Sequence, residues 1–331
     1  MILTLTPNPS LDKTVELGAP LTPGAVQRAP RNSADPGGKG VNVSRALAAA
    51  GVQTLAVLPG DPGDPVLTGL DALHVPSQSL PLGTALRTNI TIADPDGTTT
   101  KINEAGPQFS LEDQQRLAAL TVQAAAGATW IVLAGSLPPG IPADFYARLI
   151  SRLREEDDHQ APRIAVDTSG APLVAAVAAS PELIKPNAEE LLELTELLTG
   201  TSPEMSAEQL ENDPAAAVRL VREAQSRGVR AALVTLGAHG AVYVPSPGED
   251  AAAVRAWGPP IIARSTVGAG DASLAGFLLA DQAGSPPAQA LRYAMGMGRA
   301  AAGLPGSAMP TPDLIDTDII ETHLVNVETT P

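Results

Sequence analysis

The sequence predicts an α/β protein: a doubly wound, mostly parallel sheet flanked by helices, with a small β-sheet lid beside it. Three observations support this prediction. Short apolar strands alternate with Ala- and Leu-rich helical segments along most of the 331 residues. Glycine-containing turns follow several of these strands. Two segments, 13–35 and 84–103, break the alternation and look extended rather than helical.

The main sheet is predicted from runs of buried character, and the helices from longer stretches between them. The expected strands are Leu3–Thr6, Thr54–Leu58, Trp130–Ala134, Arg163–Asp167, Leu183–Lys185 and Ala231–Thr235. The expected helices are Val41–Ala50, Leu111–Ala126, Ala143–Glu155, Ala188–Leu198, Ala215–Arg227 and a buried helix that starts near Asp271. Segments 59–65, 199–214 and 245–253 are expected to be loops.

The lid is predicted from the two extended segments. Residues 84–103 form a hairpin pattern, with β-branched residues on both sides of a Pro95-Asp96-Gly97 turn. We therefore expect a discontinuous main domain (1–12, 36–83 and 104–331) and a lid (13–35 and 84–103). An isolated hairpin is marginally stable, so the lids of two subunits are expected to pair in a homodimer.

Composition limits the possible functions. The formal net charge of −15 argues against nucleic acid or an anionic membrane as partner. The chain has no cysteine, which excludes a thiol nucleophile and Cys-ligated metals, and its four histidines show no metal-ligand spacing. No run of 18 apolar residues and no basic signal region is present, so we expect a cytoplasmic protein.

The most informative motif is Val267-Gly268-Ala269-Gly270-Asp271 before an apolar helix. The first backbone N–H groups of a helix lack intrahelical partners and bind anions. A carboxylate beside them can take the proton of an attacking hydroxyl, which points to phosphoryl transfer. The alternative is a simple turn in which Asp271 caps the helix.

Glycines and polar residues near the N-terminus point to a sugar site. Gly37-Gly38-Lys39-Gly40-Val41-Asn42 opens the first long helix but lacks the Walker A spacing, and Lys39 and Asn42 can bind hydroxyls or phosphate. Asp12 follows the first strand and suits sugar hydroxyls. The alternative for the glycine-rich segment is a turn that caps the helix, and the alternative for Asp12 is an ordinary turn aspartate.

Further candidates follow three other strands. Ser136 can frame the same cleft, and Asn187 and Glu190 can hold Mg²⁺ through water. Capping of a helix by Asn187 is the alternative. The turn Thr235-Leu236-Gly237-Ala238-His239-Gly240 suits nucleotide contact through its backbone.

Together these motifs resemble the ribokinase-like (PfkB) sugar kinases, over about residues 1–310. The branch that phosphorylates sugar phosphates is the most similar; it includes 1-phosphofructokinase, tagatose-6-phosphate kinase and the minor 6-phosphofructokinase. The matching stretches occur in family order. They are Thr6–Asp12, Pro36–Arg45, Arg87–Ile90, Gly135–Gly140, Asp167–Gly170, Ile184–Asn187 and Ser265–Asp271.

The resemblance implies a role for each candidate. For catalysis it implies Asp271 as the base and an anion hole formed by Gly268, Ala269 and Gly270. For the substrate it implies sugar ligands at Asp12, Gly38, Lys39, Asn42 and Ser136, and a phosphate ligand at Arg87, with Arg28 and Lys101 as weaker candidates. For the cofactors it implies Mg²⁺ ligands at Asn187 and Glu190, and residues near ATP at Lys185, Asn187, Thr235, Gly237, Gly240 and Gly298.

The implied reaction is transfer of a phosphoryl group from ATP to a ketohexose phosphate, with Mg²⁺ as cofactor and a monovalent cation such as K⁺ as an optional one. Fructose 1-phosphate is favoured, with tagatose 6-phosphate and fructose 6-phosphate as alternatives. A ribokinase or nucleoside-type kinase and a non-catalytic sugar-phosphate sensor are further alternatives. The chain departs from the branch at Val26 and Gln27, where a basic residue is common, and at Lys101, where Glu is common.

Overall fold

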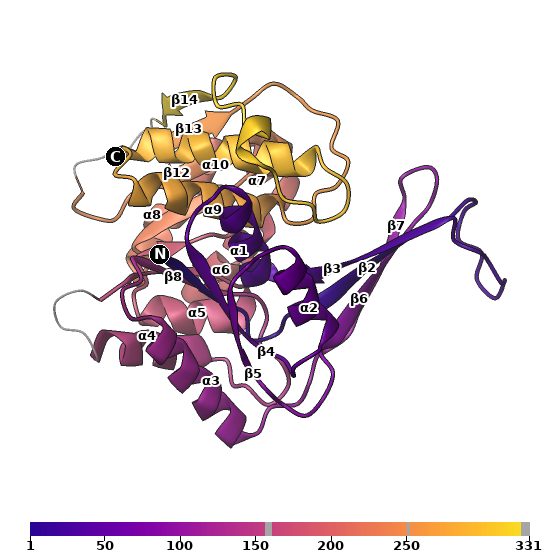
Figure 1. Ribbon diagram of the computed structural model, residues 1–331. Helices are drawn as coiled ribbons and strands as arrows, with labels where there is room; N and C mark the ends of the chain where they lie inside the picture. Colours follow the sequence, from indigo (N-terminus) through magenta and orange to yellow (C-terminus); the bar gives the residue numbers. More distant parts are fainter. Residues whose placement is uncertain (156–160, 250–251, 326–331) are drawn as a thin grey trace.

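The computed structural model describes residues 1–155, 161–249 and 252–325 (Figure 1). Within these ranges the main sheet has ten strands. The parallel strands are β1 (Ile2–Leu5), β4 (Thr54–Pro59), β5 (Ser77–Leu80), β8 (Trp130–Ala134), β9 (Arg163–Asp167), β10 (Leu183–Ile184) and β11 (Ala231–Thr235), and the antiparallel strands are β12 (Ala241–Val244), β13 (Val254–Trp257) and β14 (Glu321–Leu324). Their order is β14-β13-β12-β11-β10-β9-β8-β1-β4-β5, which confirms the doubly wound, mostly parallel sheet.

Helices cover both faces of this sheet (Figure 1). They are α1 (Lys39–Ala49), α2 (Pro65–Ala72), α3 (Leu111–Ala124), α4 (Phe145–Glu155), α5 (Gly170–Ala178), α6 (Ala188–Thr199), α7 (Ala207–Asn212), α8 (Pro214–Gln225), α9 (Ala269–Gln282) and α10 (Pro287–Ala302), with short 3₁₀ turns at Gly237–His239 and Pro312–Leu314. Side chains alternate along β8. Ile131 and Leu133 join the core with α3, α4, α5, α6 and α8, whereas Trp130 and Val132 join the core with α1, α9 and α10.

Some elements differ from the sequence-based prediction. The expected loop 199–214 contains α7, which a Ser206–Gln209 capping box starts and which buries only Leu210. Such a short polar helix has no apolar stripe to reveal it. Strands β5 and β12 to β14 and helices α2, α5 and α10 are further elements that the sequence patterns do not predict. Strand β14 lies in the tail that matches no motif; residues 326–331 of that tail and residues 250–251 of the expected loop 245–253 lie outside the described ranges.

A small separate sheet stands beside the main sheet, as predicted. Its strands are β2 (Ser10–Glu16), β3 (Arg31–Gly37), β6 (Arg87–Ala93) and β7 (Thr99–Asn103), in the order β3-β2-β6-β7. The predicted hairpin is β6–β7, closed by a hydrogen bond from Asp94 N to Thr98 O of 2.8 Å. The sheet and the β2–β3 connection project from the body of the molecule (Figure 1). Asp12 lies within β2, so the small sheet begins at Ser10 rather than at residue 13.

The topology brings the loops after β1, β8, β9, β10 and β11 to one edge of the main sheet, because parallel strands share the same direction. Helices α1 and α9 pack against each other on the face of the sheet that also carries α10. None of the helices in the described ranges combines the length and the apolar character that a bilayer crossing requires.

Candidate active site

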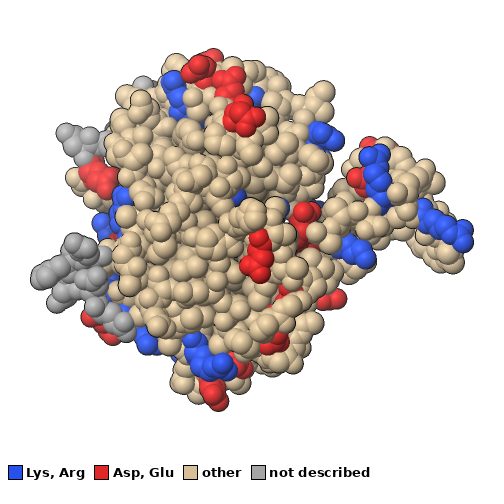
Figure 2. Space-filling model, in the orientation of Figure 1, with Lys and Arg blue, Asp and Glu red and all other residues tan. Residues whose placement is uncertain are grey.

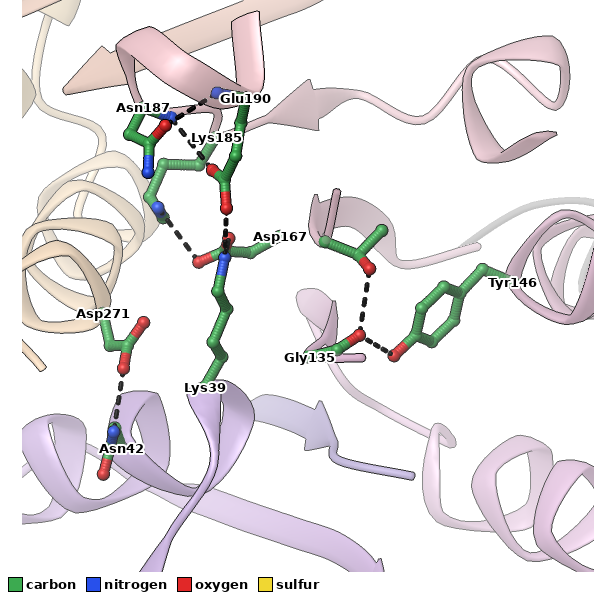
Figure 3. Close-up of polar contacts among 10 residues, drawn as sticks. Lys39, Asn42, Gly135, Tyr146, Asp167, Lys185, Asn187, Glu190 and Asp271 are labelled. Carbon is green, nitrogen blue, oxygen red and sulfur yellow. Dashed lines mark hydrogen bonds and ion pairs between the residues drawn. The ribbon is translucent and has the colours of Figure 1, made fainter. Parts of the chain in front are cut away.

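The start of α9 has the geometry expected of an anion site. Gly268 is the N-cap residue and adopts a left-handed conformation, with φ of 77°. The Asp271 carboxylate lies in the first turn, and Gly268, not Asp271, occupies the N-cap position. The carboxylate accepts a hydrogen bond of 2.8 Å from Asn42 Nδ2, so the structure favours a role in the cleft over the capping alternative (Figure 3).

A network of two lysines and two carboxylates lies beside Asp271 (Figure 3). Lys39 Nζ is 2.7 Å from Asp167 Oδ1 and 2.9 Å from Glu190 Oε1. Lys185 Nζ is 3.1 Å from Asp167 Oδ2. A Cβ added at Gly270 would lie 3.5 Å from Lys185 Nζ, so this ammonium group reaches the first turn of α9.

Burial and charge shift the pKa values of this network. Burial, followed by the negative charge of Asp167, raises the pKa of Asp271 to about 6. Burial alone would raise the pKa of Asp167, but Lys185 and Lys39 hold it below its ordinary value. Burial alone would lower the pKa of Lys39, but Asp167 and Glu190 hold it above its ordinary value. Asp271 can therefore exchange a proton near neutral pH.

Asn187 and Glu190 form a capping box at the start of α6. Glu190 N donates to Asn187 Oδ1 at 2.8 Å, and Asn187 N donates to Glu190 Oε2 at 3.0 Å. The capping alternative is thus realised. The second oxygen of Glu190 still points to Lys39, which leaves this carboxylate in the network (Figure 3).

Asp12, for which a sugar-binding role is predicted, is held by its neighbours on β2 and β6. Asp12 Oδ1 accepts hydrogen bonds from Ser10 Oγ at 2.7 Å and from Asn89 Nδ2 at 3.0 Å. A Cβ at Gly37 would overlap the Asp12 carboxylate, so a larger residue here would displace that carboxylate. Gly38, with φ of 110°, lies against Thr6 and Pro9.

A cavity of about 870 Å³ separates the small sheet from the loop before α9. One face of the small sheet lines it with Asp12, Asn89 and Lys101, and the opposite wall includes Val267, directly before Gly268. The cavity therefore extends from Asp12 and Asn89 to the loop before α9.

The predicted phosphate ligands lie in different places. Lys101 lines the cavity. Arg87 is half-buried at the start of β6, and its guanidinium donates to the backbone oxygens of Asn8 at 3.0 Å and Glu104 at 3.1 Å. Arg28 is exposed on the β2–β3 connection and does not line the cavity. Ser136 Oγ accepts from Asn8 Nδ2 at 3.2 Å, which places Ser136 near the end of β1.

The residues predicted to lie near the nucleotide are also found in different places. Thr235 forms a bridge with Asn187, so the turn 235–240 lies next to the capping box. Gly237 and Gly240 both have positive φ, and a Cβ at Gly240 would overlap Ala256 O. Gly298 is buried in α10 and packs on Ser273 of α9, where a Cβ would overlap Ser273 Oγ. Its observed role is close helix packing, and its role near adenine stays a prediction.

The structure adds two residues to which the sequence assigned no role. Asp167 is fully buried and receives both lysines, and Arg45 binds the amide of Asn42. A carboxylate at the carboxyl end of a parallel strand was a usable signal for Asp167. A mid-helix arginine in an apolar segment gave no comparable signal for Arg45.

Comparison with known proteins agrees with this geometry. The family model of the pfkB family carbohydrate kinases matches residues 8–314. A 1-phosphofructokinase from Rhodobacter capsulatus is 36% identical over 317 residues, covering 94% of this chain and 93% of the relative. A 1-phosphofructokinase from Haloferax volcanii is 35% identical, covering 98% and 97%. The crystal structure of phosphofructokinase-2 from Escherichia coli in complex with potassium has a TM-score of 0.83 and 28% identity, covering 96% and 97%. The chain belongs to the pfkB family of carbohydrate kinases, which transfer a phosphoryl group to a sugar hydroxyl.

Proposed function

We propose that this kinase uses ATP to phosphorylate the carbon-6 hydroxyl of fructose 1-phosphate, giving fructose 1,6-bisphosphate. The observation that carries the proposal is Asp271, a buried carboxylate in the first turn of α9, which follows Val267 on the wall of the cavity that Asp12 also lines. The 1-phosphofructokinases from Rhodobacter capsulatus and Haloferax volcanii support the choice of substrate.

The chemistry follows from the residues. Asp271 takes the proton of the acceptor hydroxyl as the hydroxyl oxygen bonds to the γ-phosphorus and the bond from that phosphorus to the bridging oxygen of ADP breaks. The N–H groups of Gly268, Ala269 and Gly270 stabilise the charge on the transferring group. Asp12 and Asn42 orient the sugar, and closure of the small sheet as a lid excludes water.

Mg²⁺ fits the carboxylate and amide oxygens near Lys39. Glu190 and Asn187 supply the hard oxygen donors that Mg²⁺ prefers, and Asp167 adds a third close by. Among the described residues no group of three or more His, Cys, Asp or Glu side chains is arranged to hold a metal. The proposed Mg²⁺ site is one in which these oxygens contact the ion through water. When bound, Mg²⁺ neutralises phosphate charge.

A monovalent cation such as K⁺ is a further expected ligand. The loop before α9 lies against the end of α10, where Arg264 N and Ser265 N donate to Ala302 O at 2.8 and 3.3 Å. Backbone oxygens of such a loop suit a monovalent cation. The potassium complex of phosphofructokinase-2 from Escherichia coli supports this assignment.

The second candidate substrate is fructose 6-phosphate. It is favoured by the solved complex of phosphofructokinase-2 from Escherichia coli with fructose 6-phosphate, at a TM-score of 0.80 and 26% identity. Tagatose 6-phosphate fits the same argument of a phosphorylated ketohexose. An unphosphorylated sugar or nucleoside as substrate would leave the cationic groups near the cavity without a ligand. A sensor without activity would have no need for the buried Asp271.

A homodimer through the small sheets is supported by the two faces of that sheet. The cavity side carries Asp12, Thr91 and Lys101, whereas Ile90 and Ile102 are paired across the strands on the other side. Ile102 is 53% exposed, so this apolar face is not covered by the chain itself.

Because both substrates are soluble metabolites, we place the enzyme in the cytoplasm.

A coupled assay of ADP release tests the proposed substrate. Fructose 1-phosphate, fructose 6-phosphate and tagatose 6-phosphate are compared at equal concentrations, and the highest kcat/KM is expected for fructose 1-phosphate. Asp271→Asn should lower kcat by about 10³-fold or more with little change in ATP binding. Near-normal turnover of this variant would show that Asp271 is not the base. If none of the three sugars causes ADP release, the result would favour the non-catalytic sensor.

A further inference from the structure

Arg45 is a buried arginine that the proposed reaction does not use. It lies on the second turn of α1 and is 6% exposed. Its Nη1 donates to Asn42 Oδ1 at 3.1 Å, to Pro36 O at 2.8 Å and to Ser307 Oγ at 3.2 Å. One guanidinium thus contacts the end of β3, the amide on α1 and the loop after α10.

The contact with Asn42 determines which way that amide points. Its nitrogen donates to Asp271 Oδ2 at 2.8 Å (Figure 3). Its oxygen accepts from Arg45 Nη1. A rotated amide would place its oxygen against the Asp271 carboxylate and its NH₂ group against a cation. Arg45 therefore excludes the orientation in which Asn42 cannot donate to Asp271.

The surroundings of Arg45 fit an electrostatic role. Burial lowers the pKa of Arg45, and the carboxylates of Asp35, Asp12 and Asp271 oppose this shift. A Cβ at Gly268 would lie 3.8 Å from Asn42 Nδ2, so the amide held by Arg45 also lies close to the N-cap residue of α9. The contacts therefore run from the small sheet to the start of α9.

We propose that Arg45 is a positioning residue for phosphoryl transfer, which holds the Asn42 amide so that it donates to Asp271 and ties this arrangement to the end of β3 through the carbonyl of Pro36. This inference rests on the proposed role of Asp271 as the base. It assigns to Asn42 a function beyond contact with the sugar.

Kinetics of Arg45→Met and Arg45→Lys test the proposal. Both variants should lose kcat, by about 10- to 100-fold for Arg45→Met, because the base is no longer held in place. The KM for ATP should change by less than about threefold, since the residue contacts no nucleotide-side group. Arg154→Met is the matched control: Arg154 binds the backbone oxygens of Ala179 and Ser180 on the far side of the main sheet, and its loss should leave kcat unchanged.

The pH profile separates positioning from a purely structural role. The hydrogen bond from Asn42 favours the charged form of Asp271, alongside Lys185 and Lys39, whereas burial and Asp167 favour the neutral form. Loss of that hydrogen bond in Arg45→Met should move the acid limb of kcat/KM to higher pH. Unchanged kcat and an unchanged acid limb in folded Arg45→Met and Arg45→Lys would overturn the proposal.

A double-mutant cycle with Asn42→Ala decides whether Arg45 acts through Asn42. Arg45→Met should cost almost nothing in kcat when Asn42 is already alanine. Equal costs in both backgrounds would overturn the proposal and leave the Asp271 assignment intact, whereas an active Asp271→Asn enzyme would overturn the assignment itself. If neither Arg45 variant folds, Arg45 serves folding and the proposal fails.

Discussion

Asp271 is a carboxyl group held where its charge is unfavourable. It is 8% exposed, and its pKa of about 6 results from burial first and from the charge of Asp167 second. The nearby ammonium groups of Lys185 and Lys39 and the Asn42 amide compensate only in part. A base with this pKa is ionised at neutral pH and still basic enough to accept a proton, which suits catalysis.

The same shift predicts a cost in stability. The pKa of Asp271 rises from an ordinary value of 3.8 to about 6 on folding, so the folded state binds the proton more tightly than the unfolded chain. Stability from this group is present at low pH and is lost as the pH rises from about 4 to 6. Asp271→Asn should therefore be more stable than the wild type at pH 8, by on the order of 3 kcal/mol, and this advantage should fall to on the order of 1 kcal/mol at pH 4.5.

Urea unfolding of both proteins at pH 8 and pH 4.5 measures this difference. Asp144→Asn serves as the control, because Asp144 is exposed and its ion pair with Arg148 lies on the protein surface. A variant that is less stable than the wild type at pH 8 would contradict the expectation.

Arg87 carries a second prediction at this scale. Its Nη atoms bind backbone oxygens of Asn8 and Glu104 in this structure, which fixes the guanidinium beside the end of β1. If it anchors the substrate phosphate, Arg87→Ala should raise KM for the phosphosugar by about 10- to 100-fold, because a charge-assisted hydrogen bond contributes about 1.5–3 kcal/mol. KM for ATP should stay within about twofold. Equal changes for the two substrates would argue that Arg87 only supports the β1 loop, and Lys101→Ala provides the comparison on the cavity wall.

The sequence predicted single residues better than the pairs they form. Asp271, Asn187 and Lys39 could be found because each stands at the start of a helix next to glycine or a strand end. The sequence placed Lys39 with the sugar residues, whereas its ammonium group lies on Asp167 and Glu190, 128 and 151 residues away along the chain. Such partners are set by the packing of α1 against the sheet, which local patterns do not contain.

At the scale of elements, the end of β3 positions the Asp12 carboxylate, for which we propose a sugar-binding role. Asp12 on β2 pairs with Asp35 on β3 in the register, and Gly37 faces Ser10 two residues further along. The missing Cβ of Gly37 gives the Asp12 carboxylate its space. Backbone geometry is not the reason for this glycine, because its φ is not positive.

Gly37→Ala should therefore displace Asp12 without unfolding β3. We expect KM for the phosphosugar to rise by about tenfold or more, and KM for ATP to remain nearly constant, because a shift of about 1 Å in a positioning group has effects of this size. Gly24→Ala on the β2–β3 connection is the control in the same sheet, since a Cβ there meets nothing within 4 Å. Its positive φ adds some backbone strain but no contact with the site. An unchanged KM in Gly37→Ala would show that Asp12 does not bind the sugar.

The predicted elements are those with strong periodicity. The predictions for α3 and α6 agree with the structure within two residues at each end, because their apolar residues recur at helical spacing and a capping residue precedes each. The antiparallel strands β12, β13 and β14 have four residues each and could not be recognised individually. Strand β14 also returns from the far end of the chain to pair with β13, a contact that no local pattern predicts.

At the scale of the whole molecule, two features matter: the distribution of charge on the surface and the projecting small sheet. On the face shown in Figure 2 the acidic and basic side chains are scattered rather than gathered into one basic surface, and the small sheet stands out as an arm. The arm carries polar residues toward the cavity and apolar residues away from it. An uncovered apolar sheet face is expected to pack against a partner.

We expect that partner to be a second copy of the small sheet. Ile102→Glu places a charge on the uncovered face and should convert the dimer into a monomer in sedimentation velocity at micromolar concentration. Leu197→Glu on α6 is the matched control, because Leu197 is 51% exposed and Ile102 is 53% exposed. The two variants then remove a similar amount of exposed apolar surface, and only the one on the small sheet should change the mass. A monomeric wild type, or loss of the dimer in both variants, would show that the small sheet is not the interface.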